Sequence, residues 1–558
     1  MDIKRRFLVC SALVGLSAIA QAVTIQRAVV PAQDSIRYLV VAQAMARDGL
    51  LPTLKTQNEQ PLFPAAVWLT HQGLVDCGLI GPADWAVSLQ IAAAVPLVFA
   101  VVSVYLLLGR LVGGPSALAA SLLFCLLGSI RRLGADGLSD STHLCFCCWA
   151  LWAGCHYFAW IKGNVAGRKP NAAWLAAMGA FTGIALLARA EAIVLPLAAA
   201  ATMGLAQLRP AWRQCWFRLA GGGTALVAGM ALVLVPYLAL GPARDVDSIV
   251  ARLLGRQGAD ESAPLNLPPG RVLATGADQP GWRLEGTGQL TFGRKDTAAS
   301  GRFHGYAAAA AELARELVEA LDYWVAALAA WGLWSCRRFP VRPADRFVQL
   351  AALGIMAGVL KVAATGGYLS ERHLLVPITL SLACAGVGAV KLARLASRNG
   401  FGAVPSLGQR LATFKPALVQ CSMPAALGLL CWVSGPDALH ASRSGHLQAA
   451  RWLETRTRPD DVVLDSRGWT ALYTGRTTYR YDAAQAAYSH PRLAYIVVER
   501  AELESPSRRG ETLRLLMEQA GEPVARFSPP AGRPVQQVLV YRWHPLRFAE
   551  LKGRLDAR

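Results

Sequence analysis

Residues 85–109 read WAVSLQIAAAVPLVFAVVSVYLLLG and contain no Asp, Glu, Lys or Arg. The hydrocarbon core of a bilayer is about 30 Å thick, and roughly 20 apolar residues in a helix cross it. Each peptide group in that core needs an internal hydrogen-bond partner, which a helix provides. This stretch therefore predicts a membrane-spanning helix.

Similar apolar runs lie on both sides of it. The clear ones are 7–26, 111–130, 141–161, 219–240 and 416–435, and the shorter ones are 170–188, 192–208, 347–368 and 374–390. A further helix is expected from Leu317 to Cys336, because 323–336 alone is too short to span. The first run follows MDIKRRF but precedes only a weak small-residue cleavage site, so we interpret it as an uncleaved helix. The total is about 11 spans.

The composition agrees with a polytopic membrane protein. Of 558 residues, 54% are hydrophobic and 16% are charged, with a formal net charge of +20. Ordinary soluble domains carry roughly a quarter of their residues as charges. A mean hydropathy of +0.34 argues against a disordered or nucleic-acid-binding protein, so we expect a lipid bilayer and no nucleic acid as a partner. Most of the 12 cysteines lie in apolar runs, where they behave as small hydrophobes.

Basic residues are concentrated in alternate segments between the predicted spans. With the N-terminus inside, the inner segments are basic, and most loop carboxylates fall outside. Arg131 and Arg132 fall outside, against the trend. The inner basic residues are Lys4, Arg5, Arg6, Arg110, Lys162, Arg168, Lys169, Arg209, Arg213, Arg218, Arg337, Arg338, Arg342, Arg346, Lys391, Arg394, Arg398, Arg410 and Lys415.

This topology divides the chain into two parts. Residues 1–435 form a transmembrane region with outer loops at about 31–84 and 241–316. Residues 436–558 alternate helix and strand signals, including the β-branched apolar run LAYIVVE at 493–499. Such runs are typical of strands buried in an α/β sheet. We therefore expect an extracytoplasmic α/β domain, and no internal repeat of the kind found in many transporters is visible.

The first outer loop carries the most specific motif. It reads PAQDSIRYLVVAQAMARDGLLP at 31–52, and QPLFP follows at 60–64. Three later segments are GLSDSTHLCFCCWAL at 137–151, LLARAEAIVLPL at 186–197 and ERHLLVPITLSLACA at 371–385. Their order and placement resemble the GT-C glycosyltransferases, in particular the protein O-mannosyltransferases and lipid A aminoarabinose transferases.

The resemblance implies a membrane glycosyltransferase of the inner (cytoplasmic) membrane. It would move a sugar from a polyprenyl-phosphate donor to a lipid, glycan or protein hydroxyl on the extracytoplasmic face, with inversion. Such a transfer needs a carboxylate base and cationic groups for the departing phosphate. The catalytic candidates are Asp34, Asp136 and Asp140. The phosphate-binding candidates are Arg372, Arg189, Lys361 and Lys55, and the substrate-positioning candidates are Arg37, Tyr38, Glu191 and Glu59.

Each candidate has a structural alternative. Asp34 could cap the helix that starts at Ser35, and one of Asp136 and Asp140 could cap the next helix entry. Arg189 and Glu191 could pair with each other, and Lys361 could extend to the membrane surface. Two positions depart from the family pattern: Ser35 stands where an acidic residue is common, and Gln60 where some relatives have Lys.

No cofactor follows from the motifs, and participation of a divalent metal stays open. His143, Cys145, Cys147, Cys148, Cys155 and His156 lie on one apolar helix without the paired spacing of a zinc site, which favours core packing. Gly221–Gly223 lacks a following Lys-Ser/Thr and indicates close helix packing. Two other functions remain as alternatives: a transporter or flippase for a lipid-linked or anionic solute, and a catalytically inactive assembly subunit.

Overall fold

The computed structural model describes most of the chain. The described residues are 3–56, 59–163, 171–207, 216–240, 305–336, 342–366, 369–399, 426, 439–479, 484–488, 490–530 and 536–556. The predicted span at 416–435, apart from residue 426, and residues 241–304 of the second predicted outer loop lie outside this set.

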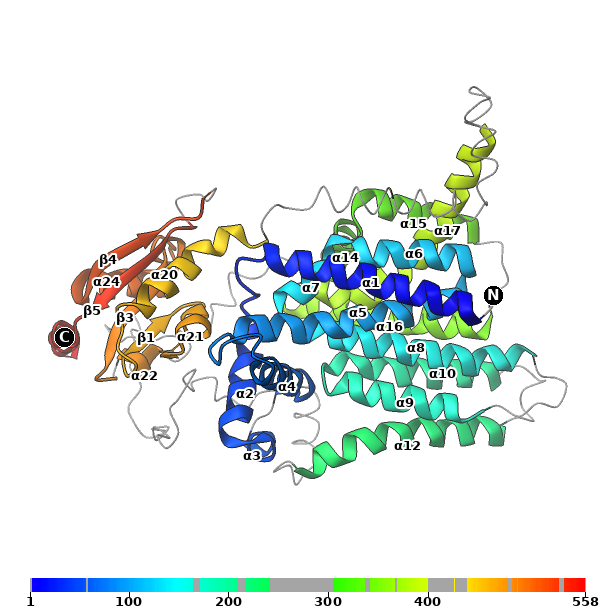
Figure 1. Ribbon diagram of the computed structural model, residues 1–558, viewed down its shortest axis with the longest axis horizontal. Coiled ribbons are helices and arrows are strands. Elements are labelled where there is room, and N and C mark those ends of the chain that lie inside the picture. The colour runs from blue at the N-terminus through cyan, green and yellow to red at the C-terminus, as the bar shows by residue number, and fades with distance from the viewer. Residues whose placement is uncertain are drawn as a thin grey trace.

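Apolar helices lying side by side form the larger part of the molecule (Figure 1). They are α1 (Ile3–Arg27), α5 (Trp85–Leu111), α6 (Gly114–Leu126), α8 (Asp140–Gly163), α9 (Ala173–Leu186), α10 (Val194–Gln207), α12 (Trp216–Leu240), α15 (Tyr323–Cys336), α16 (Pro343–Gly366) and α17 (Leu375–Asn399). Among the described residues, five helical stretches are each long and apolar enough to cross a membrane: Ile3–Arg27, Trp85–Leu111, Ala220–Leu240, Pro343–Thr365 and Glu371–Leu395. The chain is an integral membrane protein, as predicted, and the total of about 11 spans stays a prediction.

Two helices predicted as continuous are broken. In the predicted span 111–130, α6 ends at Leu126 and α7 (Gly128–Asp136) continues at an angle of 47°. Leu127 is extended at the break, and the Leu126 carbonyl accepts a hydrogen bond from Arg131 Nε at 3.0 Å. The side chain of an unexpected outer arginine thus binds the carbonyl at the break, which explains one departure from the charge trend.

The second break lies in the predicted helix 317–336. There α14 (Tyr306–Ala320) ends and α15 begins at Tyr323, with Asp322 between them in a left-handed conformation at φ +56°. In α14, Arg315 pairs with Glu312, Glu316 and Glu319, so this helix is polar on its exposed side. The prediction of one continuous span is wrong here, because the apolar part is α15 alone.

Close helix contacts hold the bundle together. A Cβ on Gly179 of α9 would approach the Leu226 carbonyl oxygen of α12 to 2.1 Å, and one on Gly229 of α12 would approach the Ala176 carbonyl oxygen equally closely. Only glycine permits this backbone approach. Of the predicted packing glycines 221–223, Gly222 lies against Tyr157, whereas a Cβ at Gly221 or Gly223 would meet open space.

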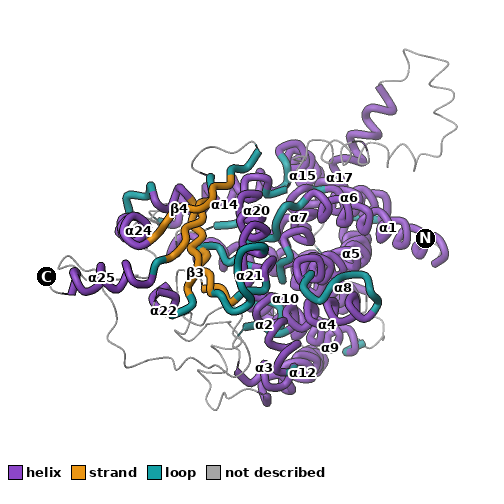
Figure 2. The backbone as a smooth tube through the Cα atoms, turned by 60° about the vertical axis from the view of Figure 1, so that its left-hand side comes forward, coloured by secondary structure: helices purple, strands orange, loops and turns teal. Residues whose placement is uncertain are grey.

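The C-terminal region contains a five-stranded sheet with helices on both faces (Figures 1 and 2). Its strands are β1 (Val462–Asp465), β2 (Thr477–Tyr479), β3 (Leu493–Glu499), β4 (Gly521–Phe527) and β5 (Val538–Trp543), in the order β2-β1-β3-β5-β4. The helices around them are α20 (Ser444–Glu454), α21 (Trp469–Thr474), α22 (Ala484–Tyr488), α23 (Arg500–Leu503), α24 (Arg508–Ala520) and α25 (Pro545–Asp556).

The strands β1, β2 and β3 are parallel, and β5 runs antiparallel to both of its neighbours, β3 and the edge strand β4. The predicted small sheet region is confirmed. Strand β4 reads GEPVARF and was not predicted, because its charged residues and proline hide the strand pattern.

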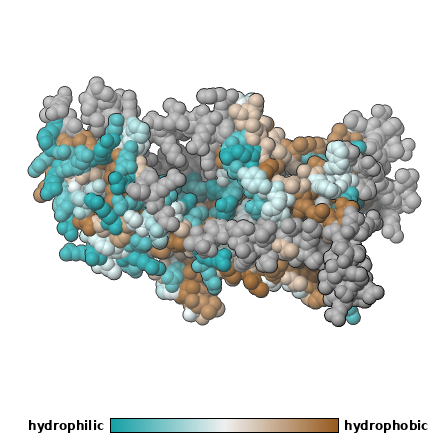
Figure 3. All heavy atoms as spheres, turned by 90° about the horizontal axis from the view of Figure 1, so that it is seen from above, coloured by the Kyte–Doolittle hydropathy of each residue, from teal (hydrophilic) through white to brown (hydrophobic). Residues whose placement is uncertain are grey.

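The sheet region rests on the segment that leads into the first outer helix. The Val29 amide donates to the Leu439 carbonyl at 3.0 Å, and Trp469 Nε1 donates to the Pro31 carbonyl at 3.3 Å. Trp469 is packed in one cluster with Ile36 and Leu39. Figure 3 shows hydrophilic atoms gathered over the sheet region at the left, with larger hydrophobic areas over the helices.

Candidate functional site

The first side of the site is built by α2 (Ser35–Asp48), a helix outside the spans. Burial of Ile36, Leu39 and Ala42 fixes this helix against the bundle and the sheet region. Asp34 immediately precedes it but makes no side-chain capping hydrogen bond. Its Oδ2 instead accepts a hydrogen bond from Arg372 Nη2 at 2.6 Å. The capping alternative for Asp34 is therefore not realised.

Arg372 lies in η3 (Glu371–Leu374), a short 3-10 turn that leads into α17. The preceding residue, Glu371, pairs with Arg132 of α7, the second arginine that departs from the charge trend. The side chains of Asp34 and Arg372 are 58% and 21% exposed. Arg372 is thus held just before the first residue of α17, and its guanidinium lies beside a carboxylate that water can reach.

Arg189 is the centre of a second ion-paired group. It lies between α9 and η1 (Ala190–Ile193), and its backbone is extended. Its Nη2 donates to Glu191 Oε1 at 2.7 Å, its Nε also faces Glu191, and its Nη1 donates to Asp140 Oδ1. Burial alone would raise the pKa of Glu191, but the adjacent Arg189 guanidinium lowers it to about 2. The predicted Arg189–Glu191 pair is present, and it includes Asp140 at the start of α8.

A third pair closes the opposite wall. Arg37 Nη2 lies 2.7 Å from Glu59 Oε1, and the Tyr38 hydroxyl lies 2.8 Å from Ser139 Oγ. The Tyr38 ring meets Phe63 edge-on with centroids 5.1 Å apart. Burial raises the pKa of Tyr38, and the Asp140 carboxylate adds to this, so the phenol stays protonated at neutral pH.

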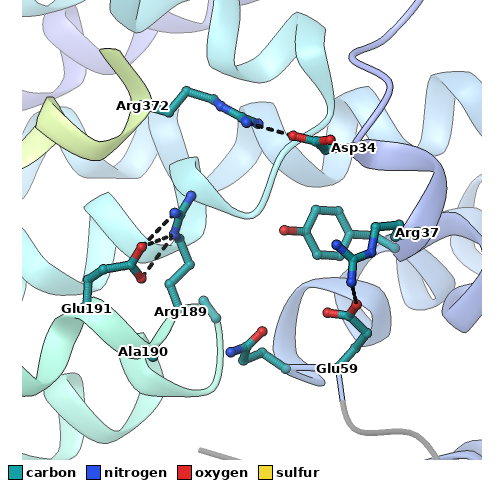
Figure 4. Close-up of a pocket in the computed structure, with 10 residues that line it drawn as sticks. Asp34, Arg37, Glu59, Arg189, Ala190, Glu191 and Arg372 are labelled. Atoms are coloured by element: carbon teal, nitrogen blue, oxygen red, sulfur yellow. Dashed lines mark hydrogen bonds and ion pairs between the residues drawn. The ribbon is translucent and has the colours of Figure 1, made fainter. Parts of the chain in front are cut away.

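These groups surround one pocket of about 280 Å³. Figure 4 shows the Arg372–Asp34, Arg189–Glu191 and Arg37–Glu59 pairs arranged around it. The lining residues are Asp34, Arg37, Tyr38, Glu59, Gln60, Ala188, Arg189, Ala190, Glu191 and Arg372. Segments more than 330 residues apart thus meet at the end of the bundle where α8, α10 and α17 begin.

Four predicted site residues do not line the pocket. Asp140 lies beneath it, with a side chain that is 2% exposed and bound to Arg189. Asp136 ends α7 and binds His440 Nε2 of the C-terminal region at 2.5 Å. Lys361 is exposed on α16 and Lys55 is exposed on α3 (Leu50–Thr56).

Three further polar residues line the pocket or bind a candidate residue, although the sequence predicted no role for them. Gln60 lines the pocket, and its position in QPLFP was the available signal. Ser139 holds the Tyr38 hydroxyl, and His440 holds Asp136. No local pattern marks His440, because its importance arises only from a contact across 304 residues.

The cysteine-rich helix α8 contains no metal site among the described residues. Cys145, Cys147, Cys148 and Cys155 are buried there as free thiols. Throughout the described ranges, no group of three His, Cys, Asp or Glu side chains is arranged to hold a metal ion. Core packing accounts for these residues.

The fold and the pocket define an integral membrane protein with an ion-paired site at one end of its helix bundle. Residues 60–238 match the family model described as dolichyl-phosphate-mannose-protein mannosyltransferase. A search of the curated proteins finds no match.

Two solved structures are similar to this chain in fold. ArnT from Cupriavidus metallidurans, bound to undecaprenyl phosphate, is similar with a TM-score of 0.60 and 14% identity, covering 95% of this chain and 97% of ArnT. The Archaeoglobus fulgidus oligosaccharyltransferase in its apo form gives a TM-score of 0.53 at 13% identity, covering 94% of this chain and 73% of that chain. The resemblance to the GT-C superfamily is confirmed, and this chain has the GT-C fold.

Proposed function

We propose that this protein is an inverting membrane glycosyltransferase that moves a sugar from a polyprenyl-phosphate carrier to a hydroxyl of a lipid, glycan or protein. The observation that carries the proposal is the Asp34–Arg372 pair. This pair lies on the rim of a polar pocket where α17 begins. A base and a phosphate-binding cation are the two groups that this reaction requires. We place the site and residues 436–558 on the extracytoplasmic face of the inner membrane, on the basis of the loop charges.

The relatives support the class of donor. The similar ArnT structure is bound to undecaprenyl phosphate, and the matching family model is described by dolichyl-phosphate-mannose. Both are polyprenyl phosphates, whose chain stays in the bilayer while the phosphate lies at the headgroup level. A pocket where membrane helices begin suits such a donor.

In the proposed reaction, Asp34 accepts the proton of the acceptor hydroxyl. The hydroxyl oxygen attacks the anomeric carbon of the sugar, and the bond from that carbon to the phosphate oxygen breaks on the opposite face. The polyprenyl phosphate leaves with the bonding electron pair, and Arg372 stabilises its charge. Donor phosphate would replace Asp34 as the partner of Arg372, which makes the carboxylate available as a base.

Arg189 has a different role in this proposal. Its guanidinium already donates to Glu191 and Asp140, so we assign it to positioning the pocket wall. Glu191, with a pKa of about 2, is a weak base at neutral pH. Asp136 and Asp140 lie outside the pocket lining, which leaves Asp34 as the proposed base.

The test compares Asp34→Asn with Asp48→Asn in reconstituted protein supplied with labelled polyprenyl-phosphate sugars. Asp48 is at the end of the same helix, pairs with Arg47 and lies outside the pocket. We expect Asp34→Asn to lower sugar transfer by about 100-fold or more, as for loss of a general base, and Asp48→Asn to leave it unchanged. Unaltered transfer by Asp34→Asn would refute the base assignment. Movement of a lipid-linked solute across vesicles without transfer would instead indicate a transporter.

A further inference from the structure

A second pocket, of about 450 Å³, lies at the opposite end of the helix bundle from the candidate site. It is lined by Arg6 near the start of α1, by Tyr105, Gly109 and Arg110 near the end of α5, and by Trp152 and His156 in the later part of α8. Helix α5 has 27 residues, a length of about 40 Å, and it runs from the end of the bundle that carries the candidate site to the end that carries the second pocket. The two pockets lie toward opposite ends of the long apolar helices.

The charges of this pocket differ from those of the candidate site. Arg6 and Arg110 are exposed, and neither forms an ion pair with a carboxylate within the described part of the chain. In the candidate site, Arg37, Arg189 and Arg372 each have a carboxylate partner. The second pocket therefore presents a net positive charge that can attract an anion. In the candidate site, the carboxylates already neutralise the arginines.

The pocket is also organised by side chains that hold one arginine in place. Arg110 Nη2 lies 3.0–3.1 Å from the ring nitrogens of His156, and since arginine is always the donor, the imidazole accepts. The imidazole is stacked on Trp174 at 4.3 Å and meets Trp152 edge-on at 4.6 Å. Aromatic packing thus fixes the imidazole, and the imidazole fixes the guanidinium at the pocket.

The composition of the walls identifies the kind of ligand. Two guanidinium groups can bind phosphate oxygens, while Trp152, Leu106 and the tyrosine ring offer apolar surface directly beside them. The ends of α1, α5 and α8 place the pocket at the level where phospholipid headgroups lie. Basic pockets between helices at this level are suited to anionic headgroups.

We propose that this pocket binds the phosphate headgroup of an anionic phospholipid in the leaflet opposite the candidate active site. The two arginines bind the phosphodiester, and the aromatic and aliphatic wall contacts the glycerol and the first acyl carbons. The site is separate from the donor site and does not depend on the proposed transfer reaction.

The experiment measures lipid binding to the full-length protein in detergent by native mass spectrometry. Phosphatidylglycerol is the anionic probe, phosphatidylcholine the zwitterionic one, and inorganic phosphate the free anion. The charge variant is Arg6→Gln/Arg110→Gln, and its matched control is Lys4→Gln/Arg5→Gln, which removes the same charge from residues outside the lining. A steric variant, Gly109→Leu, keeps all charges; a Cβ at Gly109 meets nothing within 4 Å, so the side chain can enter the pocket without a clash.

We expect one phosphatidylglycerol to bind. Each basic residue near anionic lipid contributes about 1 kcal/mol, so the charge variant should bind about thirtyfold more weakly. Gly109→Leu should weaken binding by about fivefold or more, the control pair by less than about twofold, and neither phosphatidylcholine nor inorganic phosphate should compete well. Equal losses in the control pair would overturn the proposal, as would displacement by phosphate alone or unchanged binding in Gly109→Leu. Unfolding midpoints in lipid-free detergent identify any variant that is misfolded, and Gly109→Leu then decides the outcome.

Discussion

Two of the three arginine–carboxylate groups of the candidate site differ in burial. The Asp34–Arg372 pair lies on the rim, where the carboxylate side chain is 58% exposed. In the other group, the side chain of Arg189 is 18% exposed and that of its partner Asp140 is 2% exposed. Exposed pairs contribute about 1 kcal/mol or less to stability, whereas removing one partner of a buried pair costs about 3–5 kcal/mol. The rim pair can therefore exchange partners during a reaction, and the buried group holds its shape.

Loss of Arg189 should have the largest effect on stability. Arg189→Met leaves the Asp140 carboxylate buried without its cation, so we expect the free energy of unfolding to fall by about 3–5 kcal/mol. Titration with a denaturing detergent measures this change. The matched control is Arg47→Met, which breaks an exposed pair with Asp48 and should cost about 1 kcal/mol or less. Equal losses in the two variants would contradict the expected difference in stability between a buried pair and an exposed pair.

Loss of Arg372 should affect transfer more than stability. Arg372→Ala removes the cation that we assign to the leaving phosphate, a charge-assisted contact whose loss corresponds to about 10- to 100-fold in rate. Stability should change by about 1 kcal/mol or less, because the pair is partly exposed. Arg132→Ala is the control, since Arg132 pairs with the adjacent Glu371 but does not line the pocket. A large stability loss with unchanged transfer would assign Arg372 to structure alone.

Acidification should weaken the buried group by a small amount. The folded protein lowers the pKa of Glu191 from 4.5 to about 2, so its pairing stabilises the protein above the unfolded pKa. This contribution is lost as the pH falls from about 4.5 through about 2. Because the Glu191 side chain is 41% exposed, solvent screening should keep the effect below about 1 kcal/mol. Unfolding midpoints of wild type and Glu191→Gln should converge at low pH; a constant difference would contradict the pairing.

The smallest effect is expected at the two lysines that lie outside the pocket. Lys361→Ala and Lys55→Ala should each alter sugar transfer by less than about twofold, because neither side chain reaches the lining. The same transfer assay measures both. A loss comparable to that of Arg372→Ala would mean that the pocket closes around a donor in a way that recruits the lysine.

Much of the fold follows from the sequence because the bilayer imposes a local rule. Apolar runs such as 85–109 and 219–240 correspond to Trp85–Leu111 and Ala220–Leu240, since a span must satisfy its own backbone. The breaks at Leu127 and Asp322 were not predicted, because an apolar run does not reveal where its helix bends. They depend on tertiary contacts, such as the one that Arg131 makes with the Leu126 carbonyl.

The sequence predicted which residues line the candidate site better than it predicted which of them contact one another. The motif around Asp34 and the arginines at 189 and 372 pointed to residues that now line one pocket. The local pair of Arg189 with Glu191 could be read from the sequence. The partner of Arg372 could not, since Arg372 meets Asp34 across 338 residues. The same reason explains why the burial of Asp140, a catalytic candidate from the sequence, beneath the pocket could not be predicted.

The contact between Trp469 and the Pro31 carbonyl has a consequence for biogenesis. The segment that carries Asp34 packs against a side chain that is made more than 430 residues later. Arg467 Nη1, which lies 3.2 Å from Gln33 Oε1, adds a second late contact. The nascent chain can thus insert its helices before residues 31–36 have their final support. The packing around Asp34 is therefore complete only after the C-terminal sheet region has been made and has docked against this segment.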